Sequence, residues 1–514
     1  MVRACIRVFF LIFSFLVFTI GYTLAFKSEE YPKQHSVLPL NDSISNDSLT
    51  ESNVSYKDSC ITIAAGTHYQ HGALHNFFYG KHYRDLWALP IEVKVFDIGS
   101  VNSGLKVHKK GGGFQTLSLK LADKDKKKYV LRSIDKNPTK SLPPLLQKTF
   151  AENIFRDQTS AMHPYAALVI PKLSEAAGLF HTNPVLYFIP YDERFGQYAK
   201  EFEGRVVLFE EFPDSSWAGN ELFNYADDII GSELMLAKYY KQQNVKIDER
   251  MLARARIFDL WIGDWDRHTD QWKWAEYRHD GLLYYKPIAR DRDMAFCKFN
   301  DSGIITFISS KINHKLQTFD YRYDNMQGLE KNGRYIDHLL LNSLTKQDIL
   351  SIADSLKANL SDRAIEEAIG IWPEELYRKT GSEIISKLKV RRDHLTEAAE
   401  KFYKLIAKDA IITGTDMIET VQIIRIDDNQ TSVKIFNENE ILMYSRIFLT
   451  EETETIKIFT LKGNDQITLT GIVKDGIEVE IFGGEGNDLI ADHSHVKGLS
   501  KKTKIYDSSK GNRI

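Results

Sequence analysis

The chain has 514 residues, of which 43% are hydrophobic and 12% aromatic, and its formal net charge is −3. This length and composition allow a large buried core divided among two to four domains. The nearly balanced charge argues against a nucleic-acid-binding protein, because such proteins carry a strongly basic surface.

The first 26 residues have the pattern of a secretory signal peptide. Arg3 and Arg7 precede an uncharged apolar run, Val8–Ile20, and Thr23–Ala25 offers small residues for cleavage. The run is shorter than the roughly 20 residues that cross a bilayer; an uncleaved anchor and a buried core helix are the alternatives. We therefore predict an exported protein that is periplasmic, associated with an outer membrane, or anchored by residues 1–26.

Composition and periodicity divide the rest of the chain into four parts. Residues 27–58 are polar and poor in large apolar groups, so they are predicted to be a disordered linker. Residues 59–213 are rich in strand patterns and include a first helix, residues 214–408 have helical spacing, and residues 409–514 alternate with period two. The predicted fold class is α+β: a strand-rich N-lobe and a helical C-lobe, followed by a small all-β module.

The predicted elements follow the chain in this order. Strands are expected at 61–63, 91–96, 116–121, 129–134, 206–209, 281–286, 421–426, 456–459, 467–469 and 479–481. Helices are expected at 145–160, 171–178, 226–242, 248–261 and in several stretches of 344–408.

Only two cysteines follow the leader, Cys60 and Cys297. One disulfide would be possible in an oxidising compartment, and two unpaired buried thiols are the alternative.

Polar residues gather in two loops on either side of a short strand-like segment. The first loop contains Asp264, Asp266 and Gln271, and the second contains Asp291 and Asp293. Phosphoryl transfer needs a carboxylate that accepts a hydroxyl proton and further oxygens that hold the metal bridging the phosphates. Carboxylate and amide oxygens suit Mg²⁺ or Mn²⁺. The alternative is a salt-bridge network in which arginines of the same loops neutralise the carboxylates: Arg267, Arg290 and Arg292.

The run Asp266-Arg-His, followed by Asp291-x-x-x-Ala-Phe, resembles the catalytic and metal-binding loops of atypical kinases over about residues 105–300. These include the type II phosphatidylinositol 4-kinases, the secretory-pathway kinases, the bacterial spore-coat kinases and the HipA-like kinases. The resemblance implies a kinase-like fold that binds ATP or another nucleotide, with Asp266 as catalytic base and Asp291 as metal ligand. Gln271 stands where these families have an asparagine or an acid, which implies weaker metal binding, and Asp293 is a further candidate ligand.

Upstream residues offer the phosphate-binding parts that this resemblance implies. Gly111, Gly112 and Gly113 precede a strand, as a glycine-rich loop over phosphates would, and an ordinary hairpin turn is the alternative. The next strand places Arg132 and Lys136 on one face, about 13 Å apart, so only one of them is predicted to reach the nucleotide. Kinase-like families have a lysine here, so Arg132 would be a departure.

Acidic residues are candidate partners for these cations and for the nucleotide base. Glu152 lies on the following helix and is the first choice as partner of the cation, with Asp157 as the second. Glu210 and Glu211 follow a strand where a hinge segment would contact the base of the nucleotide.

Histidines supply two further candidates. His68, His71 and His75 are spaced so that a helix would place them on one face, where they could bind a metal; a purely structural role is the alternative. His268 follows the predicted base and is assigned to the catalytic group as a residue that orients Asp266, with an ordinary loop histidine as the alternative.

Near the C-terminus, residues 482–492 resemble one calcium-binding nonapeptide of the RTX type, and residues 461–467 resemble part of a second copy. Calcium sites of this type lie between stacked turns. Because one and a half copies are not expected to stack, ordinary Asp-Gly turns of a small β-domain are the preferred interpretation.

Over about residues 60–510 the chain resembles uncharacterised bacterial envelope proteins, through Gly66-Thr-His68-Tyr and Asp264-Trp-Asp-Arg-His. The predicted function is a metal-dependent, kinase-like phosphotransferase of the cell envelope that binds a nucleotide and modifies an unknown protein, lipid or sugar. The alternatives are a pseudokinase scaffold or assembly protein that binds a membrane or envelope protein, and a metal-dependent phosphoesterase.

Overall fold

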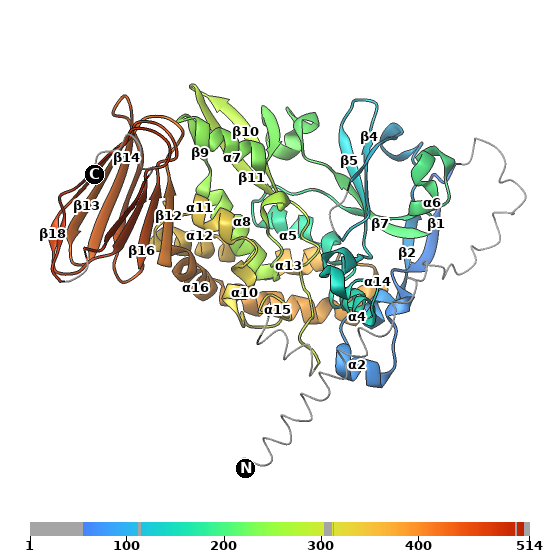
Figure 1. Cartoon of the computed structure of the whole chain (residues 1–514). Coiled ribbons are helices and arrows are strands. Elements are labelled where there is room, and N and C mark those ends of the chain that lie inside the picture. Colours follow the sequence, from blue (N-terminus) through green and yellow to red (C-terminus); the bar gives the residue numbers. More distant parts are fainter. Residues whose placement is uncertain (1–54, 112–114, 303–310, 312, 499–500, 508–514) are drawn as a thin grey trace, which may run out of the picture.

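The computed structural model of the protein describes residues 55–111, 115–302, 311, 313–498 and 501–507. The predicted leader and nearly all of the predicted linker lie outside these residues. No helix in the described part of the chain is both long and apolar enough to cross a bilayer. A strand-rich lobe, a helix-rich lobe and an all-β module follow one another along the chain, as predicted (Figure 1).

The N-lobe is built on a seven-stranded sheet with the order β1-β2-β6-β7-β5-β4-β3. Buried and exposed residues alternate along β2, whereas the central strands β5 and β7 are buried at nearly every position, so both faces of the sheet are covered there. The strands predicted in this region are confirmed, but β6 was not predicted, and neither was β3, whose sequence KVHKKG has a single apolar side chain. The strands are β1 (Cys60–Ala64), β2 (Pro90–Val95), β3 (Lys106–Gly111), β4 (Ser118–Ala122), β5 (Lys128–Ser133), β6 (Val185–Ile189) and β7 (Arg205–Glu211).

Short helices cover the N-lobe. The helix predicted at 145–160 is shorter than expected, because a 3₁₀ turn, Pro144–Leu146, precedes it and another, Gln158–Ala161, ends it. The helices of this part are α2 (Ala73–Tyr79), α3 (Arg84–Trp87), α4 (Phe150–Asp157), α5 (Ile170–Ala176) and α6 (Ala199–Phe202).

The C-lobe is centred on α8 (Glu249–Ile262), which is apolar on nearly all sides and buries ten of its fourteen residues. The helix predicted at 226–242 begins later than expected, since residues 228–231 pair with β10 as strand β8. The other elements are β8 (Asp228–Gly231), α7 (Ser232–Lys241), β9 (Val245–Ile247), β10 (Trp272–His279), β11 (Leu282–Ala289), α10 (Met326–Glu330), α11 (Arg334–Leu340), α12 (Lys346–Asn359), α13 (Asp362–Ile369), α14 (Glu374–Leu376), α15 (Ser382–Asp393) and α16 (Leu395–Lys408).

The C-terminal module consists of two main sheets with the orders β12-β16-β19-β22 and β15-β14-β13-β17-β20. It lies beside α11, α12 and α16, at the opposite end of the molecule from the N-lobe sheet (Figure 1). The strands are β12 (Asp409–Thr413), β13 (Glu419–Asp427), β14 (Gln430–Asn437), β15 (Leu442–Leu449), β16 (Thr455–Phe459), β17 (Gln466–Thr470), β18 (Ile472–Val473), β19 (Glu478–Phe482), β20 (Leu489–Asp492), β21 (His495–Val496) and β22 (Thr503–Tyr506).

Successive coils of this module lie parallel and in register. Thr455 pairs with Glu478, and the rings of Phe459, Phe482 and Tyr506 stack with centroid distances of 4.4 and 4.7 Å. The Gly-Asn-Asp turns stack as well: the backbone N–H of Asp465 donates to Asp488 Oδ1 at 2.9 Å, and that of Asn487 donates to Asn464 Oδ1 at 2.9 Å. The expectation that one and a half copies would not stack was therefore wrong, because each copy belongs to a complete coil.

The buried Asp465 makes the stability of this module sensitive to pH. Burial raises the pKa of Asp465 to about 7, against the opposing hydrogen bond from the Glu419 N–H. The protonated carboxyl is thus favoured in the folded state, and its stabilising contribution is lost as the pH rises from about 4 through about 7. In calorimetric scans across this range, we expect the melting temperature of the wild type to fall more steeply than that of Asp465→Asn, whose amide does not titrate. Parallel slopes would contradict this.

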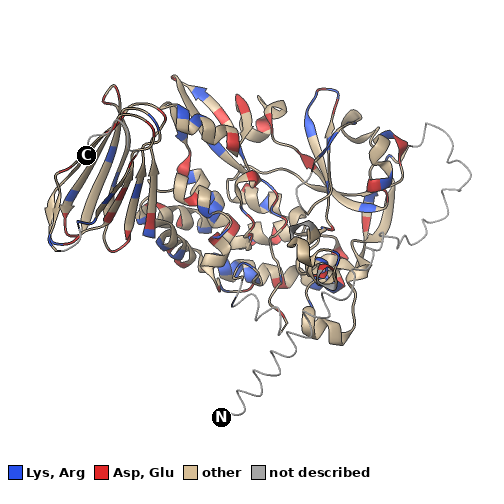
Figure 2. Ribbon diagram, viewed as in Figure 1, with Lys and Arg blue, Asp and Glu red and all other residues tan. Residues whose placement is uncertain are grey.

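Two further features of the fold concern thiols and charge. Cys60 and Cys297 are both free thiols, as the alternative of two unpaired buried thiols expects, but Cys60 is exposed and only Cys297 is buried. Basic and acidic residues are interspersed over all three parts (Figure 2), in line with the nearly balanced net charge.

Candidate functional site

The two acidic loops are brought together by the β10–β11 hairpin. The loop 263–271 begins where α8 ends at Gly263, a residue in the left-handed conformation with φ 74°. Trp272 on β10 pairs with Ala289 on β11, so the residue before the hairpin lies next to the residue after it. The Arg290 N–H accordingly donates to the Gln271 carbonyl at 2.9 Å. Hairpin register therefore places the two loops side by side.

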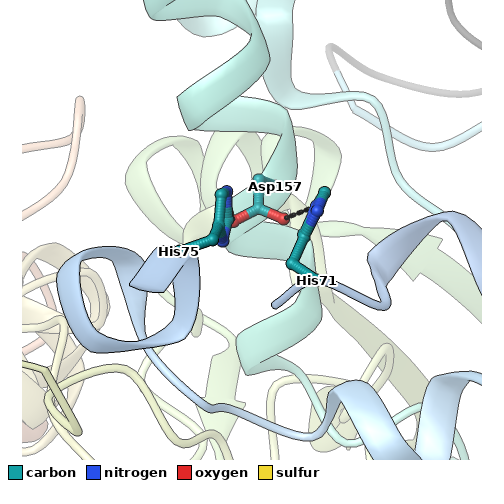
Figure 3. Close-up of side chains that lie close together, drawn as sticks. All are labelled: His71, His75 and Asp157. Atoms are coloured by element: carbon teal, nitrogen blue, oxygen red, sulfur yellow. Dashed lines mark ion pairs between the residues drawn. The ribbon is translucent and has the colours of Figure 1, made fainter. Parts of the chain in front are cut away.

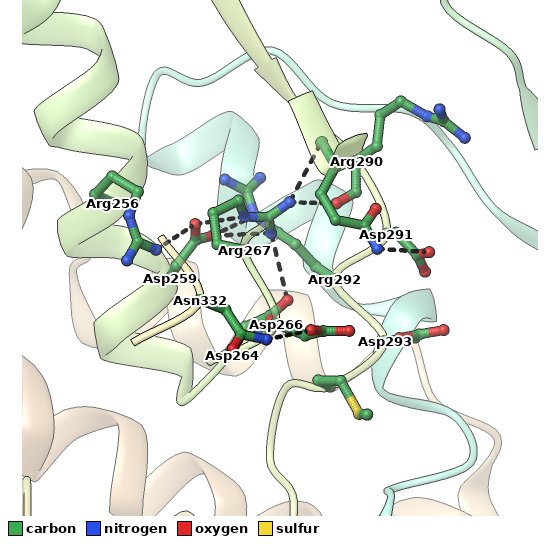
Figure 4. Close-up of polar contacts among 12 residues, drawn as sticks. Arg256, Asp259, Asp264, Asp266, Arg267, Arg290, Asp291, Arg292, Asp293 and Asn332 are labelled. Atoms are coloured by element: carbon green, nitrogen blue, oxygen red, sulfur yellow. Dashed lines mark hydrogen bonds and ion pairs between the residues drawn. The ribbon is translucent and has the colours of Figure 1, made fainter. Parts of the chain in front are cut away.

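A buried ionic layer lies beneath these loops, centred on Asp259 of α8. Its carboxylate is paired with Arg267 at 2.8 Å, Arg292 at 2.9 Å and Arg256 at 3.3 Å (Figure 4). Burial opposes ionisation of Asp259, but the three arginines outweigh it and hold its pKa below the usual range. Two of the arginines expected to neutralise the loops, Arg267 and Arg292, are thus engaged mainly by a carboxylate that the sequence did not single out.

Asp264 belongs to this buried layer as well. Arg267 lies 3.4 Å from its carboxylate, and burial nevertheless raises the pKa of Asp264 to about 7. Its Oδ1 accepts the backbone N–H of Asp266 at 3.0 Å. Asp264 is therefore a buried residue that holds the backbone of the loop 263–271 through this hydrogen bond.

The predicted base, Asp266, is held by an amide and not by a cation. Asn332 Nδ2 donates to Asp266 Oδ1 at 2.6 Å, from the segment between α10 and α11. Among the described residues no hydrogen bond joins the imidazole of His268 to Asp266; the His268 carbonyl accepts the N–H of Gln271 at 2.9 Å. The structure thus assigns the orienting contact to Asn332, which sequence reasoning missed.

The predicted metal ligand, Asp291, receives groups from both lobes. Arg132 of β5 forms an ion pair with Asp291 Oδ1, and Gln271 Nε2 donates to its Oδ2 at 3.2 Å. Burial disfavours the charge of Asp291, but Arg132 and Lys136 outweigh it and keep its pKa well below the usual range. Its backbone has φ 56°, a conformation that few residues other than glycine, asparagine and aspartate adopt. Such backbone outliers concentrate at functional sites.

Lys136 reaches the same loop. Its Nζ lies 2.7 Å from Asp293 Oδ2. Burial disfavours the charge of Lys136, but Asp293 and Asp291 outweigh it and raise the pKa of the lysine. Burial and the charge of Asp291 together raise the pKa of Asp293 to about 7. Both Arg132 and Lys136 reach the site, which corrects the expectation that only one of them would. That expectation assumed a continuous strand through Lys136, but β5 ends at Ser133.

The other N-lobe candidates lie as follows. Glu152 pairs with Arg156 at 3.0 Å, one helical turn away, and not with Arg132. The carboxylate that does pair with Arg132 is Glu210, at 2.8 Å. Glu211 points to the other face of β7 and accepts the N–H of Asn183 at 2.7 Å. The second-choice partner Asp157 pairs with Arg84; Gly111 ends β3, and Gly112 and Gly113 lie outside the described residues.

Three cations surround the ring of Phe212, just after β7. Lys120 Nζ lies 3.6 Å from the ring centroid, Arg290 Cζ 4.7 Å and Lys273 Nζ 5.1 Å. Figure 4 shows the Arg290 side chain extending away from the loop carboxylates. Burial, reinforced by neighbouring positive charges including Lys109 and Arg290, lowers the pKa of Lys120 to about 8. Like charges this close favour an anionic ligand between the lobes.

Comparisons with known proteins give distant structural matches. The chain is similar to the proinflammatory kinase CtkA of Helicobacter pylori, with 11% identity, a TM-score of 0.31, and coverage of 58% of this chain and 95% of that one. It is also similar to the amicoumacin kinase hAmiN, solved with AMP-PNP, Ca²⁺ and Ami, with 12% identity, a TM-score of 0.14, and coverage of 56% and 87%. Both TM-scores are below 0.5, so neither match assigns a function to this chain. No protein-family model matches the chain, and no curated protein does.

Proposed function

We propose that this protein is a metal-dependent, kinase-like phosphotransferase. The observation that carries the proposal is the meeting of two lobes at one site: Arg132 and Lys136 come from the N-lobe, and Asp291 and Asp293 from a C-lobe loop. Asp266 lies on the adjacent loop. Cations, metal-binding carboxylates and a base on facing lobes are the parts that phosphoryl transfer uses.

The side chains around Asp291 fit a hard divalent cation such as Mg²⁺ or Mn²⁺. Asp291 is held ionised, and Asp293 and Gln271 offer further oxygens. The Gln271 amide presents its nitrogen to Asp291, and half a turn about its last bond would present its oxygen instead. A cation bound there would offset the negative charge of the phosphates. Arg132 and Lys136 would then exchange their carboxylate partners for phosphate oxygens.

Asp266 would act on the acceptor. Its Oδ1 is occupied by the Asn332 amide, which fixes the carboxylate plane and leaves Oδ2 to accept a hydroxyl proton. The acceptor class, whether protein, lipid or sugar, is left open. A location in the cell envelope is proposed from the leader pattern of residues 1–26 alone.

The proposal predicts metal-dependent nucleotide binding that requires Asp291. We expect calorimetry on the full-length protein to show ATP binding with Mg²⁺ or Mn²⁺, weakened at least about tenfold in Asp291→Asn because the metal loses its charged ligand. Asparagine is chosen because it tolerates the left-handed backbone of this position. Asp270→Asn, an exposed change in the neighbouring loop, is the matched control and should bind like the wild type. Absence of binding by the wild type to any nucleoside triphosphate would overturn the proposal.

One observation favours a second candidate, a pseudokinase scaffold or assembly protein. In the structure the proposed metal ligands are already neutralised: Asp291 by Arg132 and Asp293 by Lys136. Such a closed network could have been retained for rigidity alone. This candidate predicts that an envelope protein co-purifies with the chain and stays bound when Asp266 is replaced by alanine. Turnover that depends on Asp266 would exclude it.

A further inference from the structure

Two histidines and an aspartate converge where α2 meets α4, away from the acidic loops. His71 lies two residues before the start of α2, His75 lies in its first turn, and Asp157 is the last residue of α4. His71 Nε2 lies 3.3 Å from Asp157 Oδ1 and His75 Nε2 lies 3.9 Å from Oδ2 (Figure 3). The two imidazole rings stack with a centroid distance of 3.9 Å.

Hydrogen bonding does not account for the position of His75. A distance of 3.9 Å is too long for a hydrogen bond to Asp157. Its other ring nitrogen, Nδ1, is buried without a hydrogen-bond partner among the described residues. A neutral imidazole has a nitrogen lone pair available to a metal.

We propose that His71, His75 and Asp157 form a binding site for a transition-metal ion of the zinc class. Two imidazole nitrogens and one carboxylate are a ligand set that zinc uses, with water in the fourth position. Tetrahedral bonds of about 2.1 Å place ligand atoms about 3.4 Å apart. The three ligand atoms lie within 4.8 Å of one another, and the His71–Asp157 distance of 3.3 Å already matches.

Arg84 is the group that opposes metal binding here. It donates to both oxygens of Asp157 at 2.6 Å each and is itself buried. The pair fixes the plane of the Asp157 carboxylate, and each oxygen retains a second lone pair. The positive charge of Arg84 will weaken the affinity. The site is open to solvent on the side of the exposed His71, so an ion has a path of entry.

A metal ion at this site would hold α2 in place. This seven-residue helix has no buried residue, and Leu74 and Phe77 are 74% and 69% exposed. A helix this short gains little stability from its own hydrogen bonds. An ion held jointly by His71, His75 and Asp157 would fasten α2 to α4 and couple metal binding to local folding.

The test is calorimetric titration of the chelator-treated full-length protein with Zn²⁺, with Co²⁺ absorption as a probe of tetrahedral coordination. We expect one equivalent to bind, and both His71→Ala and His75→Ala to weaken binding at least about tenfold. Since His71 is exposed, its replacement removes little besides its contacts with His75 and Asp157. His279→Ala is the matched control, because His279 is an exposed histidine 3.0 Å from Asp280.

Two further measurements separate this site from the phosphotransferase site. Asp291→Asn should bind Zn²⁺ like the wild type, because Asp291 belongs to the other site. Zn²⁺ should also slow amide hydrogen exchange in α2 by about tenfold or more, which a loosely bound surface ion would not do. The proposal is overturned if Zn²⁺ binding is unchanged in both His71→Ala and His75→Ala, or if the wild type binds no Zn²⁺.

Discussion

Asp266→Asn is expected to lower the rate of phosphoryl transfer by about two to four orders of magnitude, the range that general bases contribute. The amide oxygen can still accept the Asn332 N–H, so the loop keeps its shape, but no group is left to take the hydroxyl proton. ATP affinity should stay within about threefold of the wild type, because Asp266 contributes to the chemical step and not to metal binding.

This effect can be measured before the acceptor is known. Transfer of the γ-phosphoryl group of labelled ATP to the protein itself, or to an envelope extract, gives a rate for each variant. Asp270→Asn serves again as the control and should retain full activity. If Asp266→Asn transfers phosphate as fast as the wild type, Asp266 is not the base. If the variant loses ATP binding instead, the carboxylate belongs to the metal site.

Asp259→Ala is expected to have the largest effect on stability, about 3–5 kcal/mol, the cost of breaking a buried ion pair from one side. Three fully or nearly fully buried arginines, Arg256, Arg267 and Arg292, would lose their shared carboxylate. Asp337 remains 2.8 Å from Arg256 and compensates only that one. The smaller alanine side chain also leaves a cavity beside α8.

Urea unfolding, monitored by tryptophan fluorescence, tests this prediction, because Trp261, Trp272 and Trp274 are buried in the same lobe. The transition of the C-lobe should shift to lower urea concentration, while Asp270→Ala, on the surface, should shift it by no more than about 0.5 kcal/mol. The chain has several parts, so only the C-lobe transition is compared and not a global unfolding energy. An unchanged transition would mean that the arginines find other partners.

The sequence predicted the order of the three parts and ten of the twenty-two described strands, since period-two alternation needs no tertiary information. It failed where tertiary pairing overrode the local pattern, as in β8, or where no apolar pattern exists, as in β3. The helix predicted at 145–160 is shortened by 3₁₀ turns at both ends. Local rules therefore describe this fold well except where neighbouring strands decide the outcome.

The site was predictable only in part, for a physical reason. The spacing of polar residues in the two acidic loops identified Asp266, Asp291 and Gln271 as candidates. Contacts between distant segments carry no such local signal. Asp259 is an acid within a helix, and Asn332 lies far along the chain from the loop that it orients.

The predicted partner of Arg132 illustrates the same limit. Glu152 was chosen because it lies on the helix that follows, yet an arginine one turn away, Arg156, engages it. The true partner, Glu210, comes from β7, which is adjacent to β5 only through the sheet order. Where adjacent strands of a sheet are not consecutive in sequence, the local sequence does not reveal which of their side chains pair.

The parallel coils of the C-terminal module fix the lengths by which it can grow or shrink. Thr455 pairs with Glu478, and Gln466 with Leu489, so in each case the partner lies 23 residues further along the chain. Each coil contacts only its neighbours, so a whole coil can be duplicated or removed while the aromatic stack and the turns stay aligned. The coil between β19 and β22 spans 24 residues instead, since Val479 pairs with Thr503, so the repeat length is held to within one residue where Phe482 stacks on Tyr506.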